Sequence, residues 1–290
     1  MIDSALGLNK SIKRQLKFMK ATVGSLIVPK PMVVSYPKCG RTWIANVLSF
    51  YLRLQAGIEE SSELFVLQPD FRELSKQIGY KPVVLSHDVF SLGMPITNWH
   101  TRSLVNFHRG DNKALLVRDP RDTIVSLYWH MRGREAKSGL PKDITIRYFL
   151  ENFDLGLDAL IKFMNIWAPA TVSRNDIRVY HYEDLLGDWE RNKRTWIDLL
   201  EYLLGQPVDV EKLSKSVEHF HIEKLKKRIE KSGKSATNLT GIGGRIREGK
   251  SGGFREYLNK DDLRFIDARL DECLNTEAHN MISRYYFQPD

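Results

Sequence analysis

The sequence predicts an α/β fold with three layers, in which helices cover both faces of a central parallel sheet of about five strands. Four strands are expected from short apolar runs, at residues 32–36, 81–88, 114–117 and 176–182. Segments with the apolar spacing of helices lie between these runs, so strands and helices alternate along the chain. This alternation, with strands that are apolar throughout, is typical of a parallel sheet buried on both faces.

The helices are placed by their periodicity and by the residues that begin or end them. Residues 44–55 have apolar side chains at helical spacing, and Asp119 and Pro120 suit the cap and first position of another helix. A long helical stretch at 144–172 is expected to bend or end near Pro169. Further helices are expected at residues 188–204, 210–231 and 260–274.

The composition is that of a globular protein with an excess of positive charge. The chain has 290 residues, of which 42% are hydrophobic and 28% charged, and we expect one domain over residues 1–290. The net charge of +8 favours an anionic partner, such as a nucleotide, a nucleic acid, a sulfated sugar or a membrane surface. Residues 1–30 are expected to form a basic helical extension.

Cysteine content and hydropathy indicate a cytoplasmic protein. Cys39 and Cys273 are the only cysteines of the sequence, which offers no disulfide framework. No apolar run approaches the roughly 20 residues that span a bilayer, and the first residues lack a secretory signal. We therefore expect no membrane span and a cytoplasmic location.

Residues 32–43 carry the most informative pattern. Pro37 ends an apolar strand, Lys38 and Gly40 follow, and a helical pattern begins directly afterwards. A strand that turns tightly into a helix presents free backbone N–H groups at the positive end of the helix dipole, which binds anions, and a lysine adds mobile charge. The segment is P-loop-like in its mechanics, but it lacks the G-x-x-x-x-G-K-[ST] spacing of ATP-binding loops.

Cys39 offers a second interpretation of this loop, as a thiolate nucleophile activated by the helix N-terminus and by Lys38. A cysteine-dependent phosphatase needs the spacing C-x5-R, and Ala45 stands at the arginine position. We therefore disfavour a nucleophilic role for this cysteine.

Candidate side chains also lie at the ends of the other predicted strands. The residues at the strand ends are Lys38, His87, Arg118 and Tyr182. In open parallel α/β folds, ligands bind at the carboxyl ends of the strands. The predicted fold alone would therefore gather these side chains on one rim of the sheet.

Several segments resemble motifs of the sulfotransferases that use 3′-phosphoadenosine 5′-phosphosulfate (PAPS). Residues 36–43, YPKCGRTW, are similar to that family's 5′-phosphosulfate loop, commonly YPKSGTTW. Residues 118–126, RDPRDTIVS, are similar to its 3′-phosphate motif, R-[ND]-P-[KR]-D-x-x-V-S. Weaker similarities to its Y-E-D-[LM], S-F-x-x-M-K and R-K-G-x-x-G-D-W-K segments lie at residues 182–185, 221–226 and 247–255. The segments occur in family order.

The resemblance implies a sulfotransferase with PAPS as donor and 3′,5′-ADP (PAP) as product, and it requires no metal. It implies that Lys38 stabilises the leaving group and that His87 is the general base for an acceptor hydroxyl or amine. Residues 229–253 are expected to form a flexible loop over the cofactor. The implied cofactor-binding residues are Lys38, Cys39, Gly40, Arg41, Thr42, Trp43, Arg118, Ser126, Tyr182, Phe220, Leu225, Arg245, Arg247, Glu248 and Gly249. Trp43 and Tyr182 would pack on or near the adenine.

The sequence also departs from the family pattern. Cys39 and Arg41 replace a serine and a threonine, and the loop backbone can still bind phosphate. Glu248 replaces a common lysine, and neighbouring Arg245 and Arg247 can carry the charge.

Each assignment has a structural alternative. His87 could be a core histidine, Arg118 and Asp122 could form an ion pair without a ligand, and Trp43 and Tyr182 could be core aromatics. For the whole chain, one alternative is a P-loop-type nucleotide or small-molecule kinase that would hold magnesium. The other is a basic polyanion-binding module, which is disfavoured because the basic residues lie in spaced phosphate motifs rather than aromatic-interleaved stripes, and we expect no nucleic-acid partner.

The acceptor is not specified by any motif. The stretches expected to wall it lie at residues 58–80, 88–112, 131–150 and 229–245. A small alcohol, phenol, amine or guanidinium natural product, or a glycolipid, remains open, and so does the oligomeric state.

Overall fold

The protein is built around a parallel β-sheet. The structure, a computed structural model, describes residues 30–58, 74–75, 77–88, 99, 103–106, 112–132, 143–152, 156–231 and 249–286. Within these residues the sheet has four strands in the order β2–β1–β3–β4. The strands are β1 Met32–Ser35, β2 Val84–Ser86, β3 Lys113–Val117 and β4 Ile177–His181. All neighbouring strands run parallel, which confirms the predicted parallel sheet.

The register of the sheet aligns the carboxyl ends of its strands. Ser35 lies opposite Leu116, and Val117 lies opposite His181. Val34 lies opposite Ser86 on the other neighbour of β1. The residues that follow these strands therefore emerge at one edge of the sheet, as the sequence predicts.

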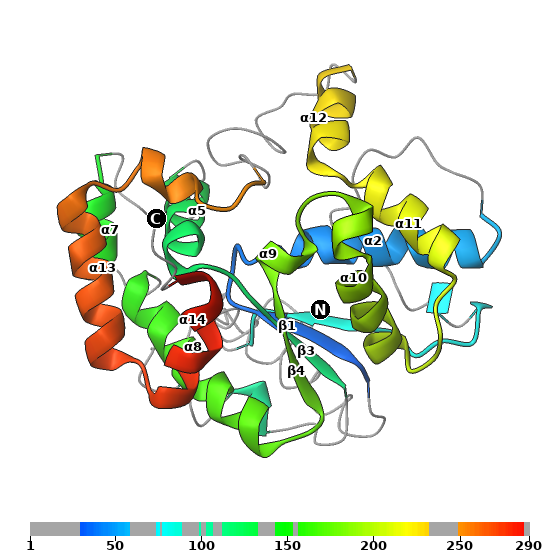
Figure 1. Ribbon diagram of the computed structural model, residues 1–290, viewed down its shortest axis with the longest axis horizontal. Helices are drawn as coiled ribbons and strands as arrows, with labels where there is room; N and C mark the ends of the chain where they lie inside the picture. Colours follow the sequence, from blue (N-terminus) through cyan, green and yellow to red (C-terminus); the bar gives the residue numbers. More distant parts are fainter. Residues whose placement is uncertain are drawn as a thin grey trace, which may run out of the picture.

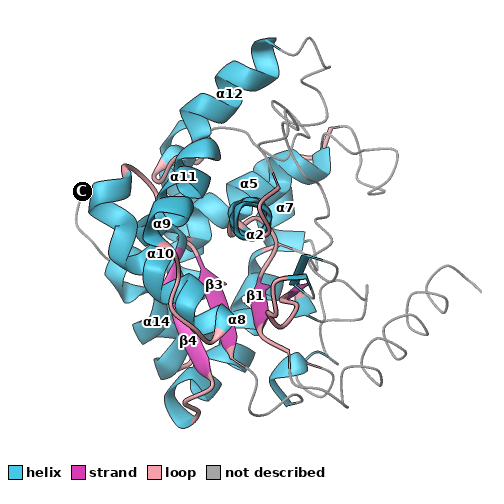
Figure 2. Cartoon of the chain, turned by 90° about the vertical axis from the view of Figure 1, so that its right-hand side faces the viewer, coloured by secondary structure: helices cyan, strands magenta, loops and turns pink. Residues whose placement is uncertain are grey.

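Helices cover both faces of the sheet, so the predicted three-layer α/β architecture is confirmed (Figure 1). One group of helices comprises α2 Arg41–Gln55, α10 Trp189–Leu204 and α11 Val210–His219. The other comprises α5 Pro120–Arg132, α7 Ile146–Asn152, α8 Leu157–Ser173, α13 Lys260–Cys273 and α14 Thr276–Tyr286. Near the strand ends lies the short α9 Tyr182–Leu185, and α12 Ile222–Lys231 extends away from the sheet (Figure 2).

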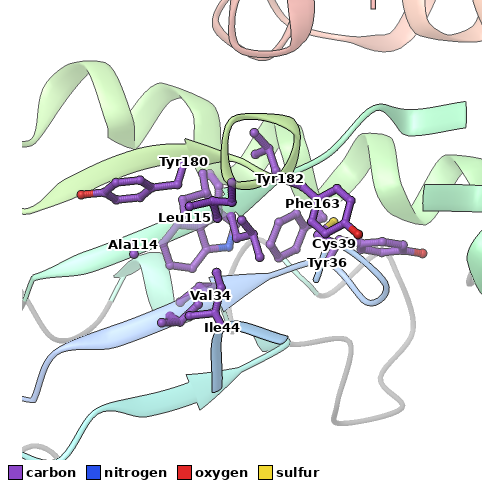
Figure 3. Close-up of a cluster of buried hydrophobic side chains, with 14 of the residues drawn as sticks. Val34, Tyr36, Cys39, Ile44, Ala114, Leu115, Phe163, Tyr180 and Tyr182 are labelled. Carbon is purple, nitrogen blue, oxygen red and sulfur yellow. The ribbon is translucent and has the colours of Figure 1, made fainter. Parts of the chain in front are cut away.

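The core extends along both faces of the sheet and up to the first loop. All four residues of β1 and all five residues of β3 are buried. Figure 3 shows Tyr36, Cys39 and Tyr182 close together near Phe163 of α8. Tyr36 contacts the Phe163 ring edge-on at 5.8 Å and donates a hydrogen bond to the Gly156 carbonyl. The loop after β1 therefore rests on the packed core.

Two of the predicted helices are each divided into two helices in the structure. The stretch predicted at 144–172 is divided into α7 and α8, and Gly156 stands at the N-terminus of α8. Pro169 lies inside α8 instead of ending it. A proline cannot donate to the carbonyl four residues before it, but the Asn275 side-chain amide donates to that carbonyl, on Asn165, at 3.0 Å. A tertiary contact thus accommodates the proline.

The second interruption divides the predicted helix 210–231 into α11 and α12, because Phe220 caps α11 before the chain turns. The sequence prediction also misses α14, which follows the last predicted helix. Asn275 is a residue type that often caps helices, so the sequence offered a signal for this helix. In the structure, Asn275 Oδ1 accepts a hydrogen bond from the Ala278 N–H at 2.8 Å.

Candidate active site

The loop between β1 and α2 is held in a tight left-handed turn. Lys38 has φ 74° and Gly40 has φ 97°, both in the region that favours glycine. The Gly40 carbonyl accepts hydrogen bonds from the N–H groups of Trp43 and Ile44 at 2.9 and 3.2 Å. Helix α2 therefore begins at Arg41, earlier than its apolar periodicity predicts, and its N-terminal N–H groups meet the loop.

Tyr182, the first residue after β4, packs directly on this loop. A Cβ atom on Gly40 would lie 2.5 Å from Cδ2 of the Tyr182 ring. The Arg118 guanidinium lies 4.5 Å from the centre of the same ring. Glycine is thus required at position 40 for two reasons, its positive φ and the close approach of an aromatic ring.

Arg118 joins two segments that are far apart in the sequence. Its Nη1 donates to the Lys38 carbonyl and its Nη2 to the Lys250 carbonyl, each at 3.1 Å. Its Nε is buried and has no hydrogen-bond partner in the described structure. A buried guanidinium N–H without an acceptor is costly, and an anion beside it would remove that cost. Arg118 therefore fits an anion-binding role at this junction.

Asp122 anchors the C-terminal segment to α5. Its carboxylate accepts the N–H groups of Gly252 and Phe254 at 2.7 and 2.9 Å, and it lies 3.9 Å from Arg118 Nη2. Ser126 lies one helical turn further along α5, and so on the same side of the helix. The segment that resembles the 3′-phosphate motif thus contains a supporting carboxylate, Asp122, and the two residues that are predicted to bind the 3′-phosphate, Arg118 and Ser126.

Of the other predicted residues, Phe220 contacts the start of α2 and Gly249 contacts the start of α12. The Trp43 indole donates through Nε1 to the Phe220 carbonyl at 3.0 Å and contacts the Tyr182 ring edge-on at 5.8 Å. Leu225 is buried on α12. Gly249 has φ 66°, and a Cβ there would lie 2.4 Å from the Ile222 side chain, so its segment lies against the start of α12.

His87 follows β2 and is held in one orientation. Its Nδ1 lies 2.9 Å from the Ser35 carbonyl oxygen. Because a carbonyl can only accept, Nδ1 carries the proton, and Nε2 keeps its lone pair. The pKa of His87 falls from 6.5 to about 3, first because of burial and then because of the charges of Arg41, Lys38 and His130, with the Ser35 carbonyl opposing. The ring is therefore neutral at pH 7.

Asp88 fixes the backbone directly after His87. This buried residue has φ 50°, and its carboxylate accepts from the Leu104 N–H and the Trp167 indole N–H, each at 2.8 Å, and from the Ser103 hydroxyl. These contacts satisfy a carboxylate that would otherwise be costly to bury. They tie the end of β2 to η3 Leu104–Asn106 and to α8, which limits how far the histidine backbone can move.

Cys39 is buried beneath the loop. Burial is the main cause that raises the pKa of its thiol to about 12, and its sulfur lies 3.9 Å from the Thr123 hydroxyl. A thiol with this pKa is protonated at pH 7, which argues against a nucleophilic thiolate. The other members of the predicted loop, Arg41 and Thr42, form the first turn of α2.

The sequence prediction gave no role to two charged or titratable residues near the site. Glu183 was quoted only as part of the Y-E-D motif, yet its carboxylate is buried next to the Arg118 segment, and burial raises its pKa to about 7. His130 has no place in the motifs of the sequence, yet its charge lowers the pKa of His87. The available signals were the position of Glu183 beside a strand end and the spacing of His130 one helical turn after Ser126.

Part of the predicted site lies outside the described residues. Arg245, Arg247 and Glu248 belong to that part, as do most of the stretches predicted to wall the acceptor. Among the residues described, no group of three or more His, Cys, Asp or Glu side chains could hold a metal ion. Within the same residues, no helix is both long enough and apolar enough to cross a membrane.

The fold and the cations at its carboxyl edge fit the binding of an anionic ligand, such as a nucleotide. A sequence model described as the sulfotransferase domain matches residues 29–276, and the chain therefore belongs to the sulfotransferase family. This confirms the family and the enzyme class predicted from the motifs. The roles of individual residues stay predictions.

The fold is also similar to a solved structure, that of mouse sulfotransferase SULT7A1 complexed with PAP. The two chains share 18% sequence identity with a TM-score of 0.54, and the match covers 92% of this chain and 93% of the mouse chain. A comparison with curated protein sequences finds no match.

Proposed function

We propose that this sulfotransferase uses PAPS as donor and transfers its sulfuryl group to a hydroxyl or amine of a small-molecule acceptor. The observation that carries the proposal is the meeting of the Lys38–Thr42 loop, Arg118 and His87 at one edge of the sheet. The family match supports sulfuryl transfer, and the PAP bound to the mouse neighbour supports this donor. The acceptor class and the cytoplasmic location rest on the sequence arguments.

The residues present fit a nucleotide with anionic groups at both ends. The N-terminus of α2 with Lys38 would hold the 5′-phosphosulfate, since backbone N–H groups and a lysine suit an oxyanion. Arg118 and Ser126 would hold the 3′-phosphate, and the orphaned Arg118 Nε supplies a buried donor for it. Trp43, which is fixed through its indole by the Phe220 carbonyl, would flank the adenine. PAPS supplies the sulfuryl group in activated form.

His87 and Lys38 would divide the proton and charge chemistry between them. His87 Nε2 would take the proton of the acceptor as its oxygen or nitrogen attacks, while Nδ1–H stays bonded to the Ser35 carbonyl. Lys38 would balance the charge that develops on the bridging oxygen as 3′,5′-ADP leaves. Because sulfuryl transfer has a loose, in-line transition state like phosphoryl transfer, positioning and charge balance are the main contributions of these residues.

The low pKa of His87 is compatible with this role because part of the lowering comes from the cations that would bind the donor. The charges of Arg41 and Lys38 both lower the pKa of the imidazole. An anionic donor against the same cations would offset their effect and strengthen the base. We therefore expect His87 to be a better base in the donor complex than in the free enzyme.

Two measurements test the proposal. Calorimetric titration with PAP and, separately, with Mg-ATP should show binding of PAP; binding of Mg-ATP without PAP would instead favour the kinase alternative. A panel of alcohols, phenols, amines and guanidinium compounds incubated with labelled PAPS and read by mass spectrometry would then identify the acceptor class. Failure to transfer label to any hydroxyl or amine would contradict the proposed reaction.

A further inference from the structure

Glu183 connects two strand ends at the edge of the candidate donor site. It follows Tyr182 in α9, and its Oε1 accepts the Asp119 N–H at 3.0 Å. Asp119 in turn accepts the Arg121 N–H at 2.8 Å, which caps α5. Glu183 therefore holds the junction between β3 and α5, the place from which Arg118 extends.

The second oxygen of this carboxylate is left without a donor. Glu183 Oε2 is buried and has no hydrogen-bond partner in the described structure. The Arg118 Nε is buried and unpartnered in the same way. A buried carboxylate with an unsatisfied oxygen is unstable as an anion, and it gains by binding a proton. The mechanism proposed above makes no use of this group.

Charged and titratable groups face Glu183 from each element packed against it. They are Arg118 and Asp119 at the β3–α5 junction, Cys39 of the first loop, Tyr182 of α9 and Tyr285 of α14. Burial raises the pKa of Glu183 to about 7, and the charge of Asp119 also raises it, while the N–H groups of Asp119 and of Glu183 itself and the Arg118 charge lower it. Glu183 thus exchanges its proton near neutral pH, next to the main cation of the site.

We propose that Glu183 is a proton-linked positioning residue, whose protonation leaves the charge of Arg118 to the anionic nucleotide. Ionised Glu183 adds a second negative charge near Arg118, besides that of Asp122, and opposes an incoming anion, whereas protonated Glu183 does neither. Nucleotide binding therefore takes up a proton at this carboxyl group. The inference rests on the proposed function, because it takes the nucleotide to be PAP or PAPS.

The test compares PAP binding to the wild-type enzyme and to Glu183→Gln by calorimetry. A glutamine keeps an oxygen that accepts the Asp119 N–H and is neutral at every pH. At pH 7, in buffers of different ionisation enthalpy, the wild type should take up as much as about half a proton more than Glu183→Gln. Between pH 6 and pH 8, its Kd should rise by up to about tenfold relative to that of the variant. Titration of PAP itself is common to both proteins and cancels.

Glu190→Gln is the matched control, because the Glu190 side chain is 77% exposed on α10. It should behave as the wild type. Equal proton uptake by the wild type and Glu183→Gln would overturn the inference, and so would a loss of affinity in Glu183→Gln that is the same at every pH, which marks a purely structural role. If no protein binds PAP, the proposed function itself is wrong.

Discussion

Arg118 donates through Nη1 to the Lys38 carbonyl oxygen at 3.1 Å, and this bond joins the two segments that are predicted to bind anions. Lys38 adopts a left-handed backbone conformation at this contact, with φ 74°. Through Nη2, the same guanidinium holds the Lys250 carbonyl of the C-terminal segment. The geometry of one predicted anion site therefore depends on the residue at the centre of the other.

Arg118→Lys should weaken PAP binding. A lysine ammonium cannot hold two carbonyls in fork geometry while lying against the Tyr182 ring. Loss of charge-assisted hydrogen bonds of this kind corresponds to a Kd about ten- to a hundredfold higher in calorimetry. Arg178→Lys is the control, because the Arg178 side chain is 52% exposed and pairs with Asp198 away from the loop. Wild-type affinity in Arg118→Lys would contradict the bridging role.

Gly40→Ala should both destabilise the fold and impair nucleotide binding. The new Cβ would lie 2.5 Å from the Tyr182 ring in a backbone with φ 97°. Strain of this kind costs about 1–3 kcal/mol of unfolding free energy, before the clash is added. Gly57→Ala is the matched comparison, since Gly57 has φ 70° with nothing within 4 Å of a Cβ. Urea unfolding should show the larger loss for Gly40→Ala, and equal losses would mean that the Tyr182 contact is not tight.

His87→Ala should strongly slow transfer while PAP binding survives. Removal of a general base lowers the rate by about 10²–10⁴-fold, whereas the predicted donor contacts come from the Lys38 loop and Arg118. Single-turnover transfer from labelled PAPS and PAP calorimetry measure the two effects separately. His279→Ala, at a side chain that is 42% exposed on α14, should leave both unchanged. Near-normal transfer by His87→Ala would mean that another group takes the proton.

Arg41→Ala should raise the pKa of His87 toward its ordinary value of 6.5, because the Arg41 charge is the largest cause of its lowering after burial. Histidine NMR titration measures the change, and Arg53→Ala, in the last turn of the same helix, should not produce it.

In the wild type, the unfolded chain protonates His87 at a higher pH than the folded chain does. Stability from this group is therefore present above pH 6.5 and is lost as the pH falls toward 3. A His87 that titrates near 6.5 in the folded wild type would contradict this environment.

The strand ends were predictable from the sequence because each strand is a local pattern, whereas the phosphate-binding roles of the two motifs stay predictions. Lys38, His87 and Arg118 each follow an apolar run directly, and the parallel fold then brings them to one edge. The role of Glu183 was not predictable, because its pKa depends on burial by segments distant in the sequence. Propensity and tertiary context also disagree at Pro169, where local rules predict a break that the structure does not have.

Asn275 supplies the hydrogen-bond donor that Pro169 lacks inside α8. Its side-chain amide donates to the Asn165 carbonyl at 3.0 Å, while its Oδ1 caps α14 by accepting the Ala278 N–H at 2.8 Å. Asn275→Asp would keep the capping oxygen and lose the donor. In the wild-type background this change should cost about 1–3 kcal/mol of unfolding free energy, because the Asn165 carbonyl loses its partner.

Replacement of the proline provides the decisive comparison. In Pro169→Ala the new N–H can donate to the Asn165 carbonyl along the helix, so Asn275→Asp should cost less in that background than beside the proline. Urea unfolding of the four proteins in this double-mutant cycle measures the difference. An equal cost of Asn275→Asp in both backgrounds would show that the Asn275 amide does not compensate for the proline, and that α8 tolerates Pro169 for another reason.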